Sequence, residues 1–540
     1  MVSIQGQCFR AVFYITAYYC MIRRAAFATG CGSARARGGN VMTGRIQMLD
    51  GSGLSIADLA AIAGNEVSVE IAPAGLTAMR ETNNILLKFA KERKPVYGVT
   101  TGLGPRVKQA LSLEEIEAFA LKTIRGRAHA IGRIMSKRLV RAAMAIRLNS
   151  LLTGASGASP RIAEHLARCL NADLVPEVGE TASIGASDLL WGGSMALALI
   201  GEGRFLGSKL ENSAADLKAA GIEALTLGPR DGLALVSHSS FSAAFAALGL
   251  QDTGNLMSAA QTAAALTLEG FRGNLSPFNP SLLSLRPQPG QSEAAADLLN
   301  RLEGSRLWEM DAARRLQDPL SIRNIAQVNG AAFAAMKTVE ETLNGEMNGA
   351  TDNPVVLAKT GEVLSGGSYL NPYLAVSLVG LNQALVHLAA GISARTAKLL
   401  SARFTDLPNG LISENADAAG FAPVAKLSEA LFAEISHLAA PPVVFPSQLG
   451  DGVEDTLTNA AISAKALQKI ARRLARLIAF EMIAAAQAIR LRVLSAEEIG
   501  VPLRPILQKI EEISPPLSDD RPMAAEIEAL AELILKGEFK

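Results

Sequence analysis

Three long segments of the chain are apolar on nearly every face that a helix would present. They cover residues 237–271, 372–404 and 460–492 and are rich in Ala and Leu. A helix without a polar face must be buried, and several such helices bury one another most readily in a bundle. Aromatic residues make up only 5% of the chain, which favours closely packed helices over β-sheet. The sequence therefore predicts an all-α protein with a long central helical bundle.

Helical spacing of apolar residues extends beyond these three segments. It predicts shorter helices over residues 55–63, 78–93, 113–131, 134–152, 160–170 and 188–200. Ser159 is the expected cap of the helix that starts at Pro160, since Pro is tolerated in a first helical turn. Runs that are typical of strands are few and short, at residues 67–71, 95–99 and 443–445.

The chain divides by pattern into four parts. Residues 42–234 are expected to form a smaller N-terminal region that carries loops, residues 235–500 the bundle, and residues 501–540 a short C-terminal helical tail. Residues 1–41 differ from the rest and are interpreted as a dispensable extension or a mis-assigned start. The alternative is a targeting segment, because Ala11–Ile22 is an apolar run, although a bilayer span needs about 20 such residues.

Charge and cysteine content exclude several classes of partner. Lys plus Arg number 52 and Asp plus Glu number 51, and a net charge of +1 argues against a face that binds nucleic acid. Three of the four cysteines lie close to the N-terminus and the fourth is Cys169, so the spacing fits neither a disulfide framework nor a zinc site. We expect a cytoplasmic protein with no metal, no membrane span and no nucleic-acid partner.

Several short motifs could carry chemistry. The YGVTTGLG motif at residues 97–104 predicts a mobile or tightly turned loop, and it lacks the Lys-Ser/Thr of a nucleotide-binding loop. Tyr97 at its head could serve as a general base, with a plain surface turn as the alternative. Ser187 or Asp188 would cap the helix that follows them. Arg323, in the QDPLSIR motif, could grip a carboxylate with two hydrogen bonds.

The order of these motifs resembles that of the aromatic amino acid lyase family, which contains histidine, phenylalanine and tyrosine ammonia-lyases and related aminomutases. The resemblance covers the chain from Met42 to the C-terminus. It rests on YGVTTGLG, the HAIG stretch from His129, RLNS from Arg147, GAS at 185–187, GEG at 201–203, QDPLSIR, ATDNP from Ala350, GGSY from Gly366, the Glu454-Asp455 pair and DRPM from Asp520.

The resemblance implies a prosthetic group, because the family builds an electrophilic methylidene-imidazolone ring from an Ala-Ser-Gly tripeptide. Ala186 and Ser187 match the first two positions, but the third is Asp188. Either Asp188 replaces Gly, or Gly is missing and Asp188 is the Asp that normally follows it. The spacing to Met195 favours a missing Gly. Whether the ring forms is left open, since a residue with a Cβ resists the compressed turn that cyclisation needs.

Other departures fall on groups that the family places around the ring. Leu320 stands in place of a second site Tyr, and Ser237 stands in place of an Asn that is expected to hydrogen-bond the ring. Tyr369 stands in place of a Phe, with Ser368 in place of the neighbouring Asn. The part of the site that would make and hold the electrophile therefore looks altered.

Groups that handle the substrate match the family. Tyr97 matches the base, Arg323 the carboxylate anchor, and Asn353 a polar group near that carboxylate. Gln317 and Glu454 match groups near the amine. The resemblance thus implies an enzyme that eliminates or shifts the α-amino group of an amino acid.

His129 lies where histidine ammonia-lyases carry a substrate-selecting His, which would favour a substrate with a polar or imidazole-like ring over one with a plain phenyl ring. The alternative is a His that is satisfied within a helix. The family also implies a homotetramer whose sites are shared between subunits, and a role in amino-acid metabolism.

Three hypotheses follow. The first is an ammonia-lyase or aminomutase. The second is a family member without the ring that uses Tyr97 and Glu454 for another elimination, cyclisation or isomerisation of a carboxylate. The third is a catalytically silent homologue that binds a small carboxylate. All three depend on one geometric prediction, namely that Tyr97 and Arg323 meet in a common cavity facing the turn after Gly185.

Overall fold

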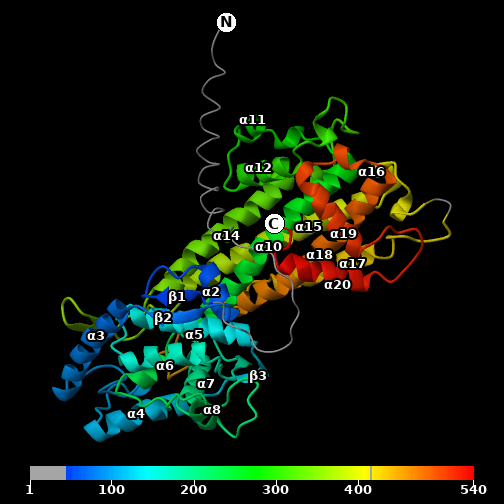
Figure 1. Cartoon of the computed structure of the whole chain (residues 1–540). Coiled ribbons are helices and arrows are strands. Elements are labelled where there is room, and N and C mark those ends of the chain that lie inside the picture. Colours follow the sequence, from blue (N-terminus) through cyan, green and yellow to red (C-terminus); the bar gives the residue numbers. More distant parts are fainter. Residues whose placement is uncertain (1–43, 414–415, 540) are drawn as a thin grey trace. The chain divides into compact units, whose positions relative to one another are not determined.

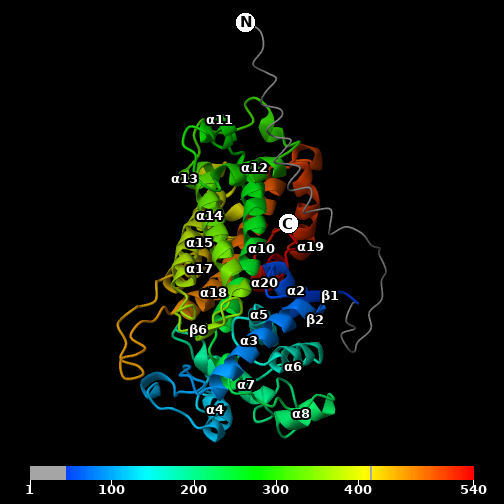
Figure 2. The same cartoon turned by 90° about the vertical axis from the view of Figure 1, so that its left-hand side faces the viewer.

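Four long helices pack side by side at the centre of the protein (Figures 1 and 2). They are α10 (Ser240–Phe271), α18 (Ala460–Leu491), α15 (Pro372–Leu399) and α14 (Ile325–Asn348), and each packs against the next in this order, with α14 returning to α10. The computed structural model describes residues 44–413 and 416–539. The interpretation of residues 1–41 therefore lies outside the described residues, whereas the prediction of an all-α bundle is confirmed.

Helix α10 is almost completely buried, and its half-buried positions are Gln251, Asp252, Gly254 and Ser258. The apolar segment that includes α10 is long enough to cross a membrane by length and composition, but its apolar window is 100% buried inside the protein. Small residues allow this close packing. A Cβ added to Gly270 of α10 would lie only 2.8 Å from the Cβ of Ala488 on α18, so a larger side chain would force the two helices apart.

A buried ion pair fixes the register of three bundle helices. Arg395 of α15 donates to both carboxylate oxygens of Glu481 on α18, at 2.7 and 3.0 Å. The hydroxyl of Thr267 on α10 also donates to Glu481, at 3.0 Å. Because a buried charge that loses its partner is costly, sliding any of the three helices would be strongly unfavourable.

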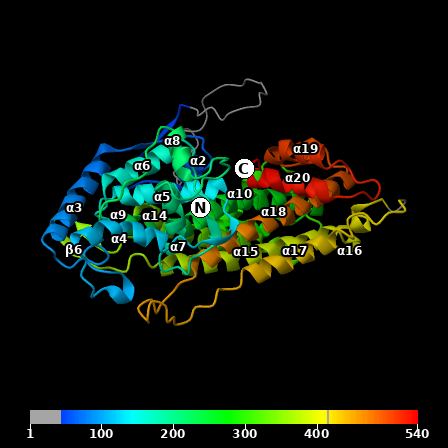
Figure 3. The ribbon, with the colours of Figure 1, turned by 90° about the horizontal axis from the view of Figure 1, so that it is seen from below.

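Further helices cover the bundle along its length. Seen from below, α17 lies along α15, while α19 and α20 lie on the other side of α18 (Figure 3). These helices and the short ones at the ends are α11 (Pro280–Leu283), α12 (Gln291–Arg301), α13 (Leu320–Arg323), α16 (Ala402–Thr405), α17 (Ala425–Leu438), α19 (Arg504–Ile513) and α20 (Ala524–Leu535). The 3-10 helices are Gly104–Arg106, Ser276–Phe278, Arg306–Trp308, Asn409–Leu411, Ala496–Glu498 and Val501–Leu503.

The N-terminal part packs shorter elements against one end of the bundle (Figure 1). Its helices are α2 (Ile56–Ala63), α3 (Pro73–Lys91), α4 (Leu113–Arg125), α5 (Lys137–Leu152), α6 (Pro160–Asn171), α7 (Leu189–Leu199), α8 (Ser213–Ala219) and α9 (Asp231–Val236). Strand β1 (Ile46–Leu49) pairs in parallel with β2 (Ser68–Ile71). Two antiparallel pairs join β3 (Ile131–Ile134) to β4 (Gly179–Thr181) and β5 (Val355–Leu357) to β6 (Glu362–Leu364). The expected Ser159 cap is confirmed, since its side chain accepts from the Arg161 N–H.

Several predicted boundaries were wrong. The helix predicted over 113–131 ends at Arg125, with Gly126 as its C-cap, and the next begins at Lys137, with Ser136 as its N-cap. Between them, Ile131–Ile134 forms β3. The segment predicted as one helix over 237–271 breaks at residues 237–239, whose polar groups bond outside the helix. The runs at 95–99 and 443–445 form turns or irregular structure instead of strands.

Candidate active site

The YGVTTGLG motif forms a tight turn that holds Tyr97 half-buried. The N–H groups of Val99 and Thr100 both donate to the Val96 carbonyl, which explains why this run is not a strand. The Gly104 N–H donates to the Tyr97 phenolic oxygen at 3.0 Å. A Cβ on Gly98, which has φ +64°, would lie 2.4 Å from a side chain of α9. The turn therefore packs directly against α9.

Arg127 is the cation that accompanies Tyr97. Burial lowers the pKa of Arg127, while the charges of Tyr97 and Glu454 raise it, so the three groups lie within electrostatic reach of one another. Tyr97 is half-buried and Glu454 is exposed. A phenolic base needs positive or hydrogen-bonded surroundings, and Arg127 together with the Gly104 N–H supplies both. The sequence reasoning missed Arg127, although it lies two positions before His129.

Residues 184–188 are fixed from two directions. The Thr458 hydroxyl donates to the Gly185 carbonyl at 3.0 Å, and the Ser187 N–H donates to the Tyr369 carbonyl at 3.1 Å. Gly185 has φ +81°, and a Cβ there would lie 2.0 Å from the Thr458 hydroxyl, so only Gly fits. Ser187 itself has φ +63°, a conformation that is uncommon for a residue with a side chain.

Asp188 is a fully buried carboxylate at the start of α7. It occupies the N-cap position, but its side chain makes no capping bond to α7, so the expected helix cap was wrong. Its oxygens accept instead from the hydroxyl of Ser183 at 2.7 Å and from the N–H and hydroxyl of Ser242, both at 2.8 Å. Burial raises the pKa of Asp188, and these hydrogen bonds oppose the rise.

Ser187 and Ser237 face each other, with their hydroxyl oxygens 3.2 Å apart. Ser237 follows directly after α9, and both side chains are buried. Because the chain leaves helical geometry between α9 and α10, the Ser237 hydroxyl reaches the segment at 186–188. A neighbouring hydroxyl, that of Ser239, donates to the Tyr369 carbonyl at 3.0 Å.

The GGSY loop reaches the same place from the middle of the chain. Ala186 and Leu370 form an isolated antiparallel bridge, which places half-buried Tyr369 beside Ser187. The Asn353 side chain accepts from the Gly366 N–H at 3.0 Å. Asn353 therefore holds the loop and lies near the predicted site.

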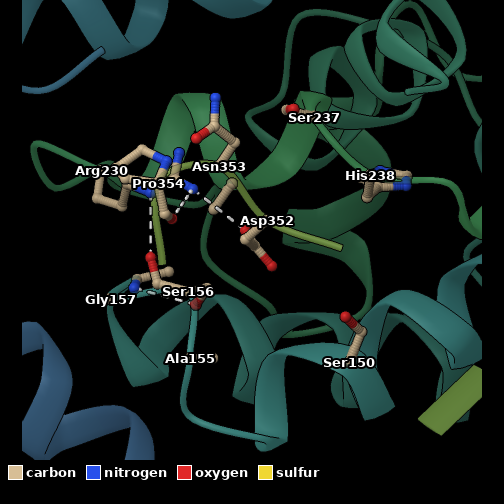
Figure 4. A network of polar contacts seen from close by, with 12 residues as sticks. Ser150, Ala155, Ser156, Gly157, Arg230, Ser237, His238, Asp352, Asn353 and Pro354 are labelled. Atoms are coloured by element: carbon tan, nitrogen blue, oxygen red, sulfur yellow. Dashed lines mark hydrogen bonds and ion pairs between the residues drawn. The ribbon is translucent and has the colours of Figure 1, made fainter. Parts of the chain in front are cut away.

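Asp352, the neighbour of Asn353, anchors this region through two buried arginines. It accepts from Arg147 at 2.9 and 3.0 Å and from Arg230 at 3.2 Å. Figure 4 shows Arg230 pointing toward Ser156 and Pro354, to whose carbonyls it also donates. All three charged side chains have no exposed surface, so the network joins four separate segments in the protein interior. The sequence reasoning singled out Asn353 and missed Asp352.

We call the residues that meet at this end of the bundle the Ser187 cluster: Tyr97, Arg127, Ser187, Ser237, Tyr369 and Glu454. Three contacts unite its members. The Tyr97 turn packs on α9, which leads into Ser237. The Arg127 carbonyl lies against Gly193 of α7. Glu454 interacts electrostatically with Arg127, and it lies four residues before Thr458, which bonds Gly185.

Gln317, Leu320 and Arg323 form a separate group, the Arg323 cluster. With its amide oriented so that the oxygen faces Arg323, Gln317 accepts from both terminal guanidinium nitrogens. The Nε atom of Arg323 is buried and has no partner among the described residues. Leu320 is 60% exposed.

The two clusters lie at opposite ends of the bundle (Figure 2). Arg323 lies directly before α14, whereas Glu346, near the other end of that helix, interacts electrostatically with Asp188. Because α14 has 24 residues, its length separates the clusters by about 36 Å. The prediction that Tyr97 and Arg323 share a cavity is therefore wrong within one chain. Two causes raise the pKa of Glu346 to about 7: burial is the larger, and the nearby charge of Asp188 is the smaller.

His129 lies in the loop between α4 and β3, with an exposed side chain. The alternative of a His satisfied within a helix is therefore wrong. Its neighbour Ala130 donates its N–H to the Ser194 hydroxyl of α7 at 3.3 Å. The loop is thus attached beside the helix that begins at the Ser187 cluster.

Comparison with known proteins identifies the family. The model of the aromatic amino acid lyase family matches residues 54–512. The chain belongs to this family. It is 32% identical to histidine ammonia-lyase of Symbiobacterium thermophilum over 91% of this chain and 96% of that protein. It is 28% identical to the ergothioneine-degrading enzyme ergothionase of Treponema denticola, with a TM-score of 0.86 over 92% of this chain and 99% of the other.

A tyrosine aminomutase from Streptomyces globisporus is also similar in structure. It is 27% identical, with a TM-score of 0.84 over 91% of this chain and 97% of the other. Membership makes this chain a carbon–nitrogen lyase of the ammonia-lyase type. The family is known for the methylidene-imidazolone group. No cluster of His, Cys, Asp or Glu in the described ranges could hold a metal ion.

Proposed function

We propose that this lyase removes or shifts the α-nitrogen of a histidine-like amino acid or betaine, with Tyr97 as the base and Arg323 as the carboxylate anchor. The observation that carries the proposal is the pairing of Tyr97 with a hydrogen-bond donor and a cation beside the Ser187 segment. The relatives named histidine ammonia-lyase supply the first substrate candidate. The exposed His129 supports a polar aromatic ring over a plain phenyl group.

The chemistry that these residues support is a β-elimination. Tyr97 takes a proton from the substrate Cβ, and the electrons of that C–H bond form the double bond to Cα. The Cα–N bond breaks and the nitrogen leaves with its electron pair as an amine. Glu454 carries the negative charge that attracts the cationic nitrogen, and Arg323 pairs with the substrate carboxylate through parallel N–H donors.

The proposed site is shared between copies of the chain. Since Arg323 lies about one helix length from Tyr97 in the same chain, a second copy must run in the opposite direction to bring its Arg323 cluster to this Ser187 cluster. Helix α15 supports such packing, because Tyr373 and Val376 on its surface are 81% and 73% exposed. An exposed apolar face of this kind indicates an interface. We propose a homotetramer in which this face is buried.

Mixing two inactive variants tests the shared site. Tyr97→Phe and Arg323→Ala are each expected to be nearly inactive, because each removes one essential group. Suppose that each site takes Tyr97 from one copy and Arg323 from another, and that the two variants assemble in equal amounts. Half of the sites then receive an intact Tyr97 and half of these an intact Arg323, so roughly a quarter of the sites have both. Restored turnover in co-expressed tetramers, measured against separately expressed and mixed proteins, would support the proposal.

The control for this test is a chain that carries both substitutions, co-expressed with unchanged chain at the same ratio. Turnover that stays absent in co-assembled tetramers of the two single variants would overturn the shared site. It would show that both residues act from one chain.

A second substrate candidate is ergothioneine, the trimethylated betaine of a sulfur-bearing histidine. Two observations favour it. The structure is similar to that of ergothionase, and Asp188 stands where the family's ring-forming tripeptide has Gly. A permanently charged nitrogen leaves as a neutral tertiary amine without losing a proton first. The two candidates differ in product, since histidine would release ammonia and ergothioneine would release trimethylamine.

A further inference from the structure

We propose that Ala186-Ser187-Asp188 stays an ordinary peptide in this protein and that no methylidene-imidazolone ring forms from it. Ser187 then keeps its hydroxyl, which, paired with that of Ser237, faces the substrate. The inference follows from how the backbone and the side chain of Asp188 are bonded. Its meaning for catalysis rests on the function proposed above.

Cyclisation makes demands on one nitrogen atom. The Asp188 nitrogen would have to bond to the Ala186 carbonyl carbon, with one water leaving from that carbonyl oxygen and a second from the Ser187 hydroxyl. In the structure this nitrogen donates its hydrogen to the His238 carbonyl at 2.7 Å. On its other side, the Asp188 carbonyl accepts from the Gly192 N–H at 2.8 Å and so belongs to the first turn of α7. The nitrogen is thus engaged by the His238 carbonyl, and the residue that carries it is bonded to the first turn of α7.

The Asp188 side chain adds a second restraint. Its carboxylate accepts three hydrogen bonds from Ser183 and Ser242 and is completely buried. Turning the residue into a five-membered ring would break these bonds and leave a buried carboxylate without partners, which is strongly unfavourable. A Gly at this position carries no such group. This restraint therefore exists because the third residue of the tripeptide in this chain is Asp188.

The surroundings of Ser187 fit a retained hydroxyl. The Ser187 and Ser237 oxygens are 3.2 Å apart, and in the family's pattern an Asn stands at the position of Ser237. The Ser187 N–H is engaged by the Tyr369 carbonyl. A substrate nitrogen that approaches the segment would therefore meet hydroxyl groups and no electrophilic carbon. This chain would therefore form no covalent bond that activates the nitrogen as a leaving group. This favours the betaine over histidine as the substrate.

Mass spectrometry of the full purified chain tests the inference directly. Trypsin would release the peptide Cys169–Arg204, which contains the segment and no internal Lys or Arg. We expect this peptide at the mass of its unmodified sequence, and we expect the folded protein to show no absorbance band of a conjugated ring. A peptide lighter by two waters would overturn the inference. A family member with the Ala-Ser-Gly tripeptide, digested in the same way, is the control that must show the loss.

Two further measurements separate the inference from the proposed function. Borohydride, which reduces electron-poor double bonds, should leave the peptide mass unchanged, and a gain of hydrogen there would overturn the inference. The Ser187→Ala peptide should be lighter than the unchanged peptide by one oxygen atom, because only the hydroxyl oxygen is lost, and a variant peptide heavier than the unchanged one would overturn the inference. If neither substrate is turned over, the peptide mass still decides the inference, and only the proposed function fails.

Discussion

Tyr97→Phe is expected to lower the turnover rate by about a thousandfold, the middle of the range for loss of a general base. The substitution removes only the phenolic oxygen, which lies 3.0 Å from the Gly104 nitrogen and within reach of the Arg127 charge. The aromatic ring stays to pack in the turn. Substrate affinity should change by no more than a few fold, because the hydroxyl acts on the reacting proton and the carboxylate anchor is untouched.

Tyr373→Phe is the matched control for this prediction, because it also removes one phenolic oxygen and keeps the ring, at a position on α15 outside the Ser187 cluster. It should leave turnover unchanged. The two variants should also unfold at similar temperatures, since neither change removes buried apolar volume. A Tyr97→Phe enzyme that retains more than a tenth of the normal rate would show that another group takes the proton.

Asp352→Ala is expected to produce the largest loss of stability, about 3–5 kcal/mol. The carboxylate is the shared partner of Arg147 and Arg230, and none of the three side chains has exposed surface. Burial lowers the pKa of Arg230 to about 10, with Asp352 as the main opposing charge. Removing Asp352 would leave two guanidinium groups buried side by side without compensation. The midpoint of denaturant unfolding measures the effect.

Arg133→Gln provides the comparison, because it breaks a surface ion pair with Glu180 in which the Arg133 side chain is 78% exposed. Exposed pairs of this kind contribute about 0–1 kcal/mol. If Asp352→Ala shifts the midpoint no more than Arg133→Gln does, the network is not the anchor of this region. The DNP turn and the GGSY loop that Asn353 holds should lose order together in the Asp352→Ala variant.

The bundle could be predicted from sequence because apolar residues on every face leave a helix no other place than the interior. The breaks in it could not. No Gly or Pro marks a break at residues 237–239, yet Ser237 and Ser239 lie outside the helix because their hydroxyls bond groups far away in the sequence. Among the strands, β2 (Ser68–Ile71) coincides with the predicted run at 67–71, and the others were missed for a similar reason. Each strand has only three or four residues. Whether such a short strand forms depends on the partner that tertiary packing brings close to it, and the local sequence pattern does not show this.

The candidate site was predictable only in part. Motif order identified Tyr97, Ser187 and Ser237, which the structure brings together at one end of the protein. It gave no hint of Arg127, because a basic residue in a loop has no pattern that marks it as a partner of Tyr97. Nor could motif order show that Arg323 lies at the far end of a 24-residue helix, since distance in space depends on which way that helix runs.

Turnover by the purified protein tests the central claim most directly. The full chain should be incubated with histidine and, separately, with ergothioneine, while ammonia, trimethylamine and the ultraviolet absorbance of the conjugated product are followed together. The account predicts that one of the two yields its amine and the unsaturated acid in equal amounts, with no product from the Tyr97→Phe protein. Binding of both compounds without release of either amine and without formation of a β-amino isomer would contradict it and would leave a carboxylate-binding homologue without lyase activity.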